Sequence, residues 1–182
     1  MAADGGLKIL SGGQIGADVA ALRAARRLGL ATGGFAPAGF MTAHGRNPQL
    51  AEFGLAPVGG GTLAQQYVRR SQMNVDAADA TLAVRLEPSA GTDRTIGYAV
   101  CKRWAACADL APGATAEPAA AHRPVLVVQT LGEGAAPAIR EFLHRRRVRT
   151  LNVCGHRACA LVPNFESAVE HLLYRALSEY TA

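Results

Sequence analysis

The sequence predicts an α/β protein with a Rossmann-like fold, in which helices flank an open, mainly parallel sheet on both faces and give three layers. Short apolar runs alternate with helical patterns along the chain, and glycine-bearing turns follow several of these runs. The chain has 182 residues, of which 49% are hydrophobic and 18% charged, so it can bury a substantial core. We therefore expect a single domain over residues 1–182 and exclude a disordered or low-complexity chain.

The first third of the chain begins with a strand and a helix. The apolar residues 7–10 predict the first strand, and the alanine, leucine and arginine content of 18–28 predicts a helix that stops at Gly29. Residues 30–35 form a short stretch broken by glycines. Residues 37–48 begin and end with proline and contain further glycines, so we expect a functional loop there rather than a regular element.

Two helices and a strand are expected in the middle of the chain. Residues 63–75 have a helical pattern, and residues 80–86 predict a strand. A further helix opens at Gly91-Thr92, and its apolar residues recur at spacings of three or four as far as Cys107, which predicts a stripe that packs on the sheet. The alanine- and proline-rich residues 109–122 predict an exposed connector.

The last third alternates strand and helix again. The continuous apolar run at 124–129 predicts a buried parallel strand, and it is followed by a helical pattern at 135–147 and a strand at 149–154. Apolar residues between 165 and 180 follow a period of 3.6 residues and predict the final helix. Asn164 is its candidate N-cap.

The charge and the cysteine content limit the cellular compartments and the classes of binding partner that we expect for this protein. The formal net charge of +5 favours an anionic partner, and part of it lies in the basic run 144–149. We expect this run to be a solvated helix end, because no aromatic residue interleaves with it to stack on bases, and nucleic acid is not the expected partner. Reduced cysteines and the lack of a long apolar run or a signal-like start predict a soluble, cytoplasmic protein with no membrane partner.

Three glycine-bearing turns follow predicted strands, at residues 11–16, 90–95 and 155–157. In an open parallel sheet the carboxyl ends of the strands share one edge, so we expect these turns to meet in one composite site. Glycine lets the backbone approach a phosphate closely, and free N–H groups at a helix start attract anions. The sequence therefore predicts a small phosphate-bearing ligand.

Each turn also allows a purely structural interpretation. The first turn has neither the Walker motif nor the G-x-G-x-x-G spacing, so glycines that serve packing alone are an alternative. Asp18 either contacts the ligand or complements the dipole of the helix it begins. Thr92 either lines the anion site or acts as a plain N-cap. In the third turn, Arg157 would make a charge-assisted contact with an anion.

Metal and serine hydrolase chemistry find little support in the sequence. Cys154, His156 and Cys159 are close together but lack the C-x-x-C spacing of a structural zinc site, so we expect no bound metal. Neither G-x-S-x-G nor H-E-x-x-H occurs, so neither a serine triad nor a zincin site is predicted.

Six motifs follow one another along the chain: SGGQIGADVAAL (11–22), GGFAPAG (33–39), YVRRSQMNV (67–75), DATL (79–82), GT (91–92) and LNVCGHR (151–157). As an ordered set they resemble the circularly permuted YpsA group of the SLOG superfamily. The resemblance covers roughly residues 7 to 173. Members of this group are often described as molybdenum carrier proteins.

The resemblance implies a Rossmann-like fold, a homo-oligomer and a site for a nucleotide or a nucleotide-derived ligand. It assigns phosphate or sugar contacts to Gly12, Gly13, Gln14, Gly91 and Thr92. It assigns the lining or bracing of the pocket to Arg70, Asn74, Asp79, Asn152 and Arg157. The complete set of candidate ligand-binding residues is Gly12, Gly13, Gln14, Gly16, Asp18, Gly34, Arg70, Asn74, Asp79, Gly91, Thr92, Asn152, Gly155 and Arg157.

The chain departs from the usual pattern of this group at several positions. Ile15 and Val19 stand where a threonine and an arginine are usual, and residues 40–45 replace a segment with basic and acidic residues. Related phosphoribohydrolases carry a glutamate after their P-G-G-x-G-T loop, whereas here Thr95 follows Gly91-Thr92. The catalytic acid of that pattern is therefore absent, and the resemblance does not imply a particular ligand.

The leading hypothesis is a protein that binds or senses a phosphate-bearing, nucleotide-like ligand. Carriage of the molybdenum cofactor is a special case, because that cofactor also carries a phosphate. The alternative is a hydrolase of an N-glycosidic or phosphate bond in the same pocket, with Asp18, Asp79 or Asp93 as its acid or base. The binding hypothesis predicts that Gly13→Val or Thr92→Val abolishes ligand binding while the domain still folds.

Overall fold

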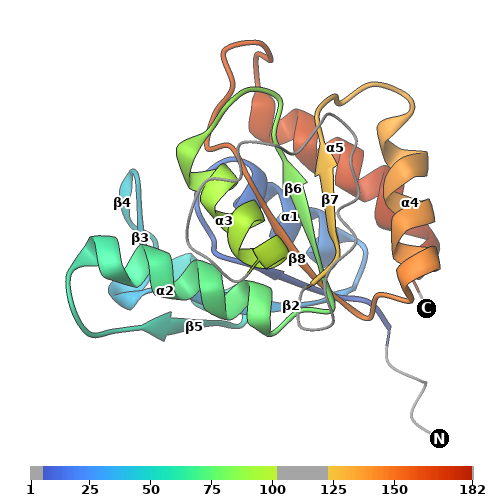
Figure 1. Ribbon diagram of the computed structural model, residues 1–182. Helices are drawn as coiled ribbons and strands as arrows, with labels where there is room; N and C mark the ends of the chain where they lie inside the picture. Colours follow the sequence, from blue (N-terminus) through green and yellow to red (C-terminus); the bar gives the residue numbers. More distant parts are fainter. Residues whose placement is uncertain (1–5, 102–122, 182) are drawn as a thin grey trace, which may run out of the picture.

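The computed structural model describes residues 6–101 and 123–181 (Figure 1). The predicted connector at 109–122 and the end of the predicted helix around Cys107 lie outside the described residues.

A six-stranded sheet forms the centre of the molecule, and every neighbouring pair of its strands is parallel. Its strands in spatial order are β5 (Leu55–Val58), β2 (Ala31–Pro37), β1 (Lys8–Ser11), β8 (Thr150–Gly155), β6 (Ala80–Val84) and β7 (Val125–Val128). The last strand in the sequence, β8, therefore lies between β1 and β6. The fold class expected from the sequence is confirmed.

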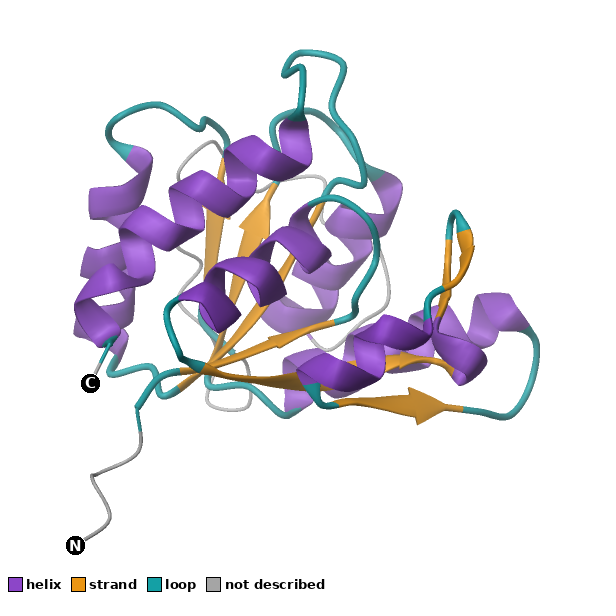
Figure 2. Cartoon of the chain, turned by 180° about the vertical axis from the view of Figure 1, so that it is seen from behind, coloured by secondary structure: helices purple, strands orange, loops and turns teal. Residues whose placement is uncertain are grey.

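Helices cover both faces of this sheet and give three layers (Figure 1, Figure 2). One face carries α1 (Ala17–Arg27), α4 (Ala135–Arg146) and α5 (Phe165–Leu177), and the other carries α2 (Leu63–Asp76) and α3 (Ala90–Cys101). No helix in the described ranges is long and apolar enough to cross a bilayer.

The alternation of side chains along the central strands divides the core between the two faces. Leu151 and Val153 of β8 are fully buried against α1, α4 and α5, in a cluster that also holds Ile139 and Leu173. Asn152 and Cys154 point to the opposite face, where Cys154 packs with residues of α2 and α3. Polar groups of β8 are thereby placed on the side of the sheet that α2 and α3 cover.

The helices begin and end where local chemistry favours it. In α2, the Thr62 hydroxyl accepts a hydrogen bond from the Gln65 N–H, and the Gln65 side chain accepts one from the Thr62 N–H, which completes a capping box. In α4, the basic residues 144–146 occupy the last turn, as expected of a solvated helix end. Asn164 stands at the N-cap position of α5, but its backbone is left-handed and its side chain makes no capping hydrogen bond.

The region between α1 and α2 is more regular than the sequence predicts. The glycine-broken stretch at 30–35 forms strand β2, and the expected loop at 37–48 contains a small hairpin of β3 (Met41–Thr42) and β4 (Gly45–Arg46). Short 3-10 turns at Ala38–Phe40 and Pro48–Phe53 flank this hairpin, and a third, Ser178–Tyr180, follows α5. Strand β5 was not predicted, because it includes Pro57, which strands accept mainly at a sheet edge.

Candidate functional site

The three turns that the sequence singles out meet at the carboxyl-terminal edge of the sheet, where they surround a cavity of about 400 Å³. Gln14 and Asp18 come from the first turn and the start of α1, Gly91 and Thr92 from the start of α3, and Gly155 and Arg157 from the end of β8. The expected convergence is therefore present in the tertiary structure.

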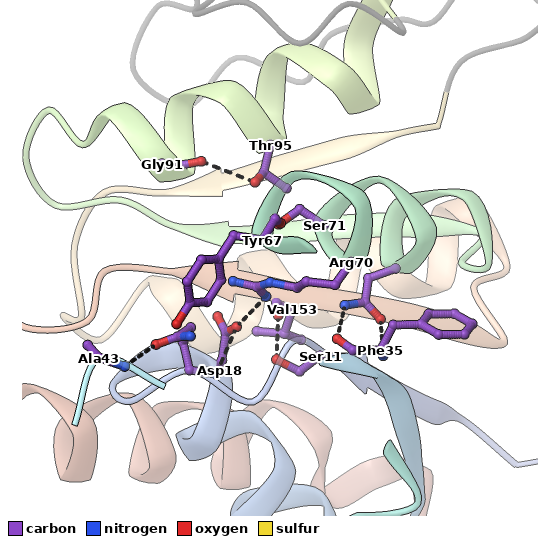
Figure 3. Close-up of polar contacts among 12 residues, drawn as sticks. Ser11, Asp18, Phe35, Ala43, Tyr67, Arg70, Ser71, Gly91, Thr95 and Val153 are labelled. Carbon is purple, nitrogen blue, oxygen red and sulfur yellow. Dashed lines mark hydrogen bonds and ion pairs between the residues drawn. The ribbon is translucent and has the colours of Figure 1, made fainter. Parts of the chain in front are cut away.

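Helix α2 supplies the wall of the cavity between these turns. Arg70 extends from α2 toward the first turn, and its Nη1 atom lies 3.0 Å from Oδ2 of Asp18 (Figure 3). Only 13% of the Arg70 side chain and 4% of the Asp18 side chain are exposed, so this ion pair is largely removed from solvent. The N–H of Gln14 also donates to the Asp18 carboxylate.

The electrostatics of this pair reflect two opposing effects. Burial raises the pKa of the Asp18 carboxyl above its usual 3.8, while Arg70 and the N–H groups of Gln14 and Gly12 favour the charged form and act in the opposite direction. The Nε atom of Arg70 is buried and has no hydrogen-bond partner among the described residues. Of the guanidinium nitrogens of Arg70, Nη1 therefore donates to Asp18, whereas the buried Nε has no partner among the described residues.

The glycines of the first turn have structural reasons to be glycines. A Cβ on residue 12 would lie 1.3 Å from Nη1 of Arg70, so Gly12 makes room for the guanidinium. Gly13 has a φ of +67°, and a Cβ there would lie 2.8 Å from the side chains of Leu50 and Leu55. Contrary to the sequence-based expectation, this geometry predicts that Gly13→Val strains the backbone, overpacks its surroundings and destabilises the domain.

Three further candidate glycines lie in equally tight surroundings. A Cβ on Gly16 would meet the carbonyl oxygens of His156 and Arg157 at 2.3 Å, one on Gly34 would meet that of Ser11 at 2.2 Å, and one on Gly155 would meet that of Val84 at 2.5 Å. Gly155 lines the cavity, but Gly12, Gly13, Gly16 and Gly34 do not. At these four positions the close contacts are those expected of glycines that serve packing rather than ligand binding.

Gly91 differs from these glycines. It lines the cavity near the start of α3, and a Cβ built on it meets no atom within 4 Å. Its backbone is helical, a conformation open to any residue, so neither packing nor backbone conformation requires a glycine there. The space around this position is open.

The turn between β6 and α3 is held by side chains rather than left free. Asp93 forms an ion pair with Arg85 and accepts a hydrogen bond from the Ser89 N–H at 3.3 Å. Thr92 is not the N-cap, because α3 already begins at Ala90, and its hydroxyl donates instead to Oγ of Ser89 at 3.2 Å. Thr92 and Ser89 both line the cavity with hydroxyl groups.

His156 fixes the same turn from β8. Its Nε2 atom accepts hydrogen bonds from the N–H groups of Leu86 at 2.9 Å and Glu87 at 3.2 Å. Burial lowers the pKa of His156 below its usual 6.5, which keeps the imidazole neutral and able to accept these bonds. His156 is thus a structural part of the site that shapes the turn without lining the cavity.

Two other polar residues brace the surroundings of the cavity. The amide of Asn74 accepts a hydrogen bond from the N–H of Phe35 at 2.9 Å and donates one to its carbonyl at 3.0 Å, which ties α2 to β2. The amide of Gln14 donates to the Met41 carbonyl and accepts from the Ala43 N–H, which ties the first turn to the β3–β4 hairpin. Both side chains line the cavity.

Asp79 does not belong to this site, contrary to the expectation. Its carboxylate accepts hydrogen bonds from the N–H groups of Arg149 and Thr150, at 2.9 and 2.8 Å, where β8 begins. Asp79 itself precedes β6, so it lies at the amino-terminal edge of the sheet, opposite the cavity. It joins the starts of two neighbouring strands.

The charge of the cavity is mainly positive. Arg94 and Arg157 line it together with Arg70, and within the described ranges neither Arg94 nor Arg157 forms an ion pair or a side-chain hydrogen bond. Asp18 supplies a carboxylate at the wall, already paired with Arg70. Such a site attracts an anion.

The sulfur groups near the cavity do not form a metal site. Among residues 6–101 and 123–181 there is no group of three or more histidine, cysteine or acidic side chains arranged to hold a metal ion. Cys154 lines the cavity and Cys159 is also buried, and both are free thiols. Burial, with a further contribution from Asp18, raises the pKa of the Cys154 thiol far above its usual value.

Sequence reasoning missed part of the lining. Ala64, Tyr67, Val68 and Ser71 recur at spacings of three and four on α2 and share the face that borders the cavity. This spacing was visible in the sequence, but without the position of α2 it does not distinguish a cavity wall from a core face. Arg94 and Thr95 also line the cavity and belong to the predicted turn at 90–95, whereas Ser89 and Cys154 were not predicted as ligand-binding residues.

A parallel Rossmann-like sheet with a cationic cavity at its carboxyl-terminal edge defines a class of α/β proteins that bind small ligands at such edges. The chain belongs to the circularly permutated YpsA SLOG family, whose model matches residues 9–177.

A solved structure is similar to this chain over nearly its whole length. The crystal structure of a "putative molybdenum carrier protein" from Syntrophus aciditrophicus superposes with a TM-score of 0.73 at 26% sequence identity, over 95% of this chain and 96% of that chain. No curated protein matches the sequence significantly.

Proposed function

We propose that this protein binds a small, phosphate-bearing, nucleotide-like ligand in the cavity between α2, α3 and the end of β8, and that it acts as a sensor or carrier of that ligand. The observation that carries the proposal is the pair Arg94 and Arg157, which line the cavity and form no ion pair or side-chain hydrogen bond within the described ranges. A guanidinium group without an anionic partner can make a charge-assisted hydrogen bond with an anionic oxygen of a ligand in the cavity.

The rest of the lining supports an anion with more than one charge. Three arginines border the cavity and Asp18 neutralises one of them, so Arg94 and Arg157 are available to a ligand. The hydroxyl groups of Ser89 and Thr92 stand near the start of α3, whose first N–H groups favour negative charge. A phosphate or diphosphate group matches this combination better than a single carboxylate does.

Binding is favoured over hydrolysis by the placement of the acidic groups. Asp79 lies at the opposite edge of the sheet, and Asp93 is paired with Arg85. Asp18 lines the cavity, but its carboxylate already accepts hydrogen bonds from Arg70 and Gln14. An acid or base that must exchange a proton with a substrate would first have to leave these partners.

Carriage of the molybdenum cofactor is a special case of the same proposal. The arginines and hydroxyl groups of the cavity suit the phosphate end of such a cofactor. For its metal end the described lining offers the Cys154 thiol, whose raised pKa keeps it protonated. The arginines and hydroxyl groups of the described lining therefore suit recognition of the organic phosphate part.

A thermal-shift experiment with the full chain tests the proposal. The panel consists of inorganic phosphate, ribose 5-phosphate, AMP, ADP-ribose, NAD, a phosphorylated pterin and molybdate. A ligand at 100 times its dissociation constant should add about 2.7 kcal/mol to the free energy of unfolding. Stabilisation by at least one organic phosphate, without its turnover in the same sample, supports a binding protein. A panel without any stabilisation contradicts the proposal, and turnover favours the hydrolase alternative.

The assembly state and the cellular location are further parts of the proposal. A homo-oligomer is supported by the family resemblance, and a cytoplasmic location by the free thiols of Cys101, Cys154 and Cys159. Sedimentation velocity of the purified chain tests the first, and fractionation of the source cells tests the second.

A further inference from the structure

Helix α2 presents an apolar surface to one part of the cavity. Ala64, Tyr67 and Val68 lie at spacings of three and four on the helix, and all three line the cavity. None of them belongs to the buried hydrophobic clusters found among the described residues. Their apolar surface therefore borders the cavity and contributes to none of these clusters.

The orientation of Tyr67 is fixed by the neighbouring hairpin. Its hydroxyl donates a hydrogen bond to the Met41 carbonyl at 3.3 Å, and the ring reaches from α2 toward the first turn (Figure 3). The side chain is half-buried, and its ring forms no aromatic or cation–π pair with a described residue. An oriented ring of this kind offers an unused π-face at little cost in side-chain entropy.

The lining of the cavity is thus chemically divided. The apolar surface of Ala64, Tyr67 and Val68 comes from the first half of α2, whereas Arg94 and Arg157 come from α3 and the turn after β8. The volume of about 400 Å³ lies within the range of small-ligand pockets, which is about 300–1,000 Å³. One small molecule with a flat apolar part and an anionic part matches both regions.

We propose that Tyr67 is the stacking platform of a ring subsite, so that the ligand is a phosphorylated planar heterocycle such as a nucleoside phosphate. This inference rests on the proposed function and specifies it: the arginines bind the phosphate, and the ring of the ligand lies against Tyr67, with Ala64 and Val68 beside it. Stacking on an aromatic side chain accepts different bases, because every base has a π-face. The subsite selects for a ring rather than for one base.

Isothermal titration of the full chain with AMP, adenosine and ribose 5-phosphate tests the subsite. AMP and ribose 5-phosphate carry the same phosphate and sugar and differ in the ring. The wild-type protein should bind AMP at least about tenfold more tightly than ribose 5-phosphate. Tyr67→Leu should reduce this difference to about twofold, whereas Tyr67→Phe, which keeps the ring and loses the hydroxyl, should retain most of it.

The control variant is Tyr174→Leu, on α5 at the other face of the sheet, which should behave as the wild-type protein does. Circular dichroism of each variant confirms that it is folded. Equal binding of AMP and ribose 5-phosphate overturns the subsite and leaves the proposed phosphate site standing. The same holds if Tyr67→Leu retains the full preference for AMP. If AMP, ribose 5-phosphate and adenosine all fail to bind, the subsite is overturned, and the thermal-shift panel alone decides whether the proposed function stands.

Discussion

The Nε2 atom of His156 accepts a hydrogen bond from the N–H of Leu86 at 2.9 Å, and this bond links the end of β8 to the turn that leads into α3. A neutral imidazole accepts at this nitrogen, whereas a protonated one does not. The shape of one wall of the cavity therefore depends on the protonation state of a residue outside its lining.

This bond predicts a specific loss of stability at mildly acidic pH. Burial lowers the pKa of His156 in the folded state below its usual 6.5, so the unfolded chain binds more protons than the folded one between these two pKa values. The stabilisation is complete above about pH 6.5 and is lost as the pH falls through the lower pKa of the folded state. Urea unfolding between pH 7.5 and 5 should show this loss in the wild-type protein and a flatter profile in His156→Gln.

His144→Gln serves as the control for that experiment, because His144 is exposed in the last turn of α4. It should keep the pH profile of the wild-type protein. An unchanged profile in His156→Gln would show that the two hydrogen bonds to His156 do not govern the stability of this region.

Gly91→Val should weaken ligand binding by at least about tenfold while the protein remains folded. The new side chain meets no protein atom near its Cβ, so the fold tolerates it, and it adds bulk at a position that lines the cavity, where we expect it to compete with the ligand. The measurement is titration with the organic phosphate that gives the largest thermal shift. Gly134→Val is the matched control, since Gly134 precedes α4, is also open around its Cβ and lies outside the cavity. Equal affinity of the two variants would exclude Gly91 from the binding site.

Arg70→Met should lower the free energy of unfolding by about 3–5 kcal/mol at neutral pH, because it leaves the carboxylate of Asp18 buried without its partner. The loss in the free energy of unfolding should become larger as the pH rises. Burial already raises the pKa of Asp18 above 3.8, and loss of Arg70 raises it further, so the folded variant binds more protons than its unfolded state from pH 3.8 upward. Its stability therefore falls as the pH rises through the pKa of folded Asp18.

The control for this prediction is Arg69→Met on the same helix, where Arg69 is exposed and donates to the Gly59 carbonyl. Its effect on urea unfolding should be small and independent of pH. A similar loss in both variants would mean that the Arg70–Asp18 ion pair contributes no more than a surface contact.

Arg94→Gln and Arg157→Gln should each reduce the affinity for a phosphate-bearing ligand by about tenfold and make binding less sensitive to salt. Both side chains line the cavity and have no ion-pair partner within the described ranges. Arg147→Gln, in the basic run after α4, is the comparison, and its affinity should match that of the wild-type protein. Titrations at 50 and 200 mM salt measure both effects. A loss of binding in Arg147→Gln alone would instead favour a surface partner at the basic run.

The fold class and the location of the site could be predicted from the sequence, because both depend on patterns that are local in the chain. The apolar runs, the helical periods and the glycine turns identify parallel strands joined through helices. A parallel sheet places the carboxyl ends of its strands at one edge, and for that reason the turns at 11–16, 90–95 and 155–157 meet at the cavity. Strand β5 was not predicted, because it contains Pro57 and proline argues against a strand in the sequence. The structure places β5 at the edge of the sheet, where proline is tolerated.

The roles of the individual side chains were decided by contacts between residues far apart in the sequence. A Cβ on Gly13 would collide with Leu50 and Leu55, whereas one on Gly91 would meet no atom, and no local pattern distinguishes these two glycines. Asp79 is an acidic residue of the kind expected in a ligand site, but it lies at the amino-terminal edge of the sheet. Its carboxylate there accepts hydrogen bonds from N–H groups at the start of β8. The sequence by itself determined a Rossmann-like sheet with three turns that meet at one edge. Only the tertiary structure decided which polar groups face that site, because the direction of a side chain depends on what packs behind it.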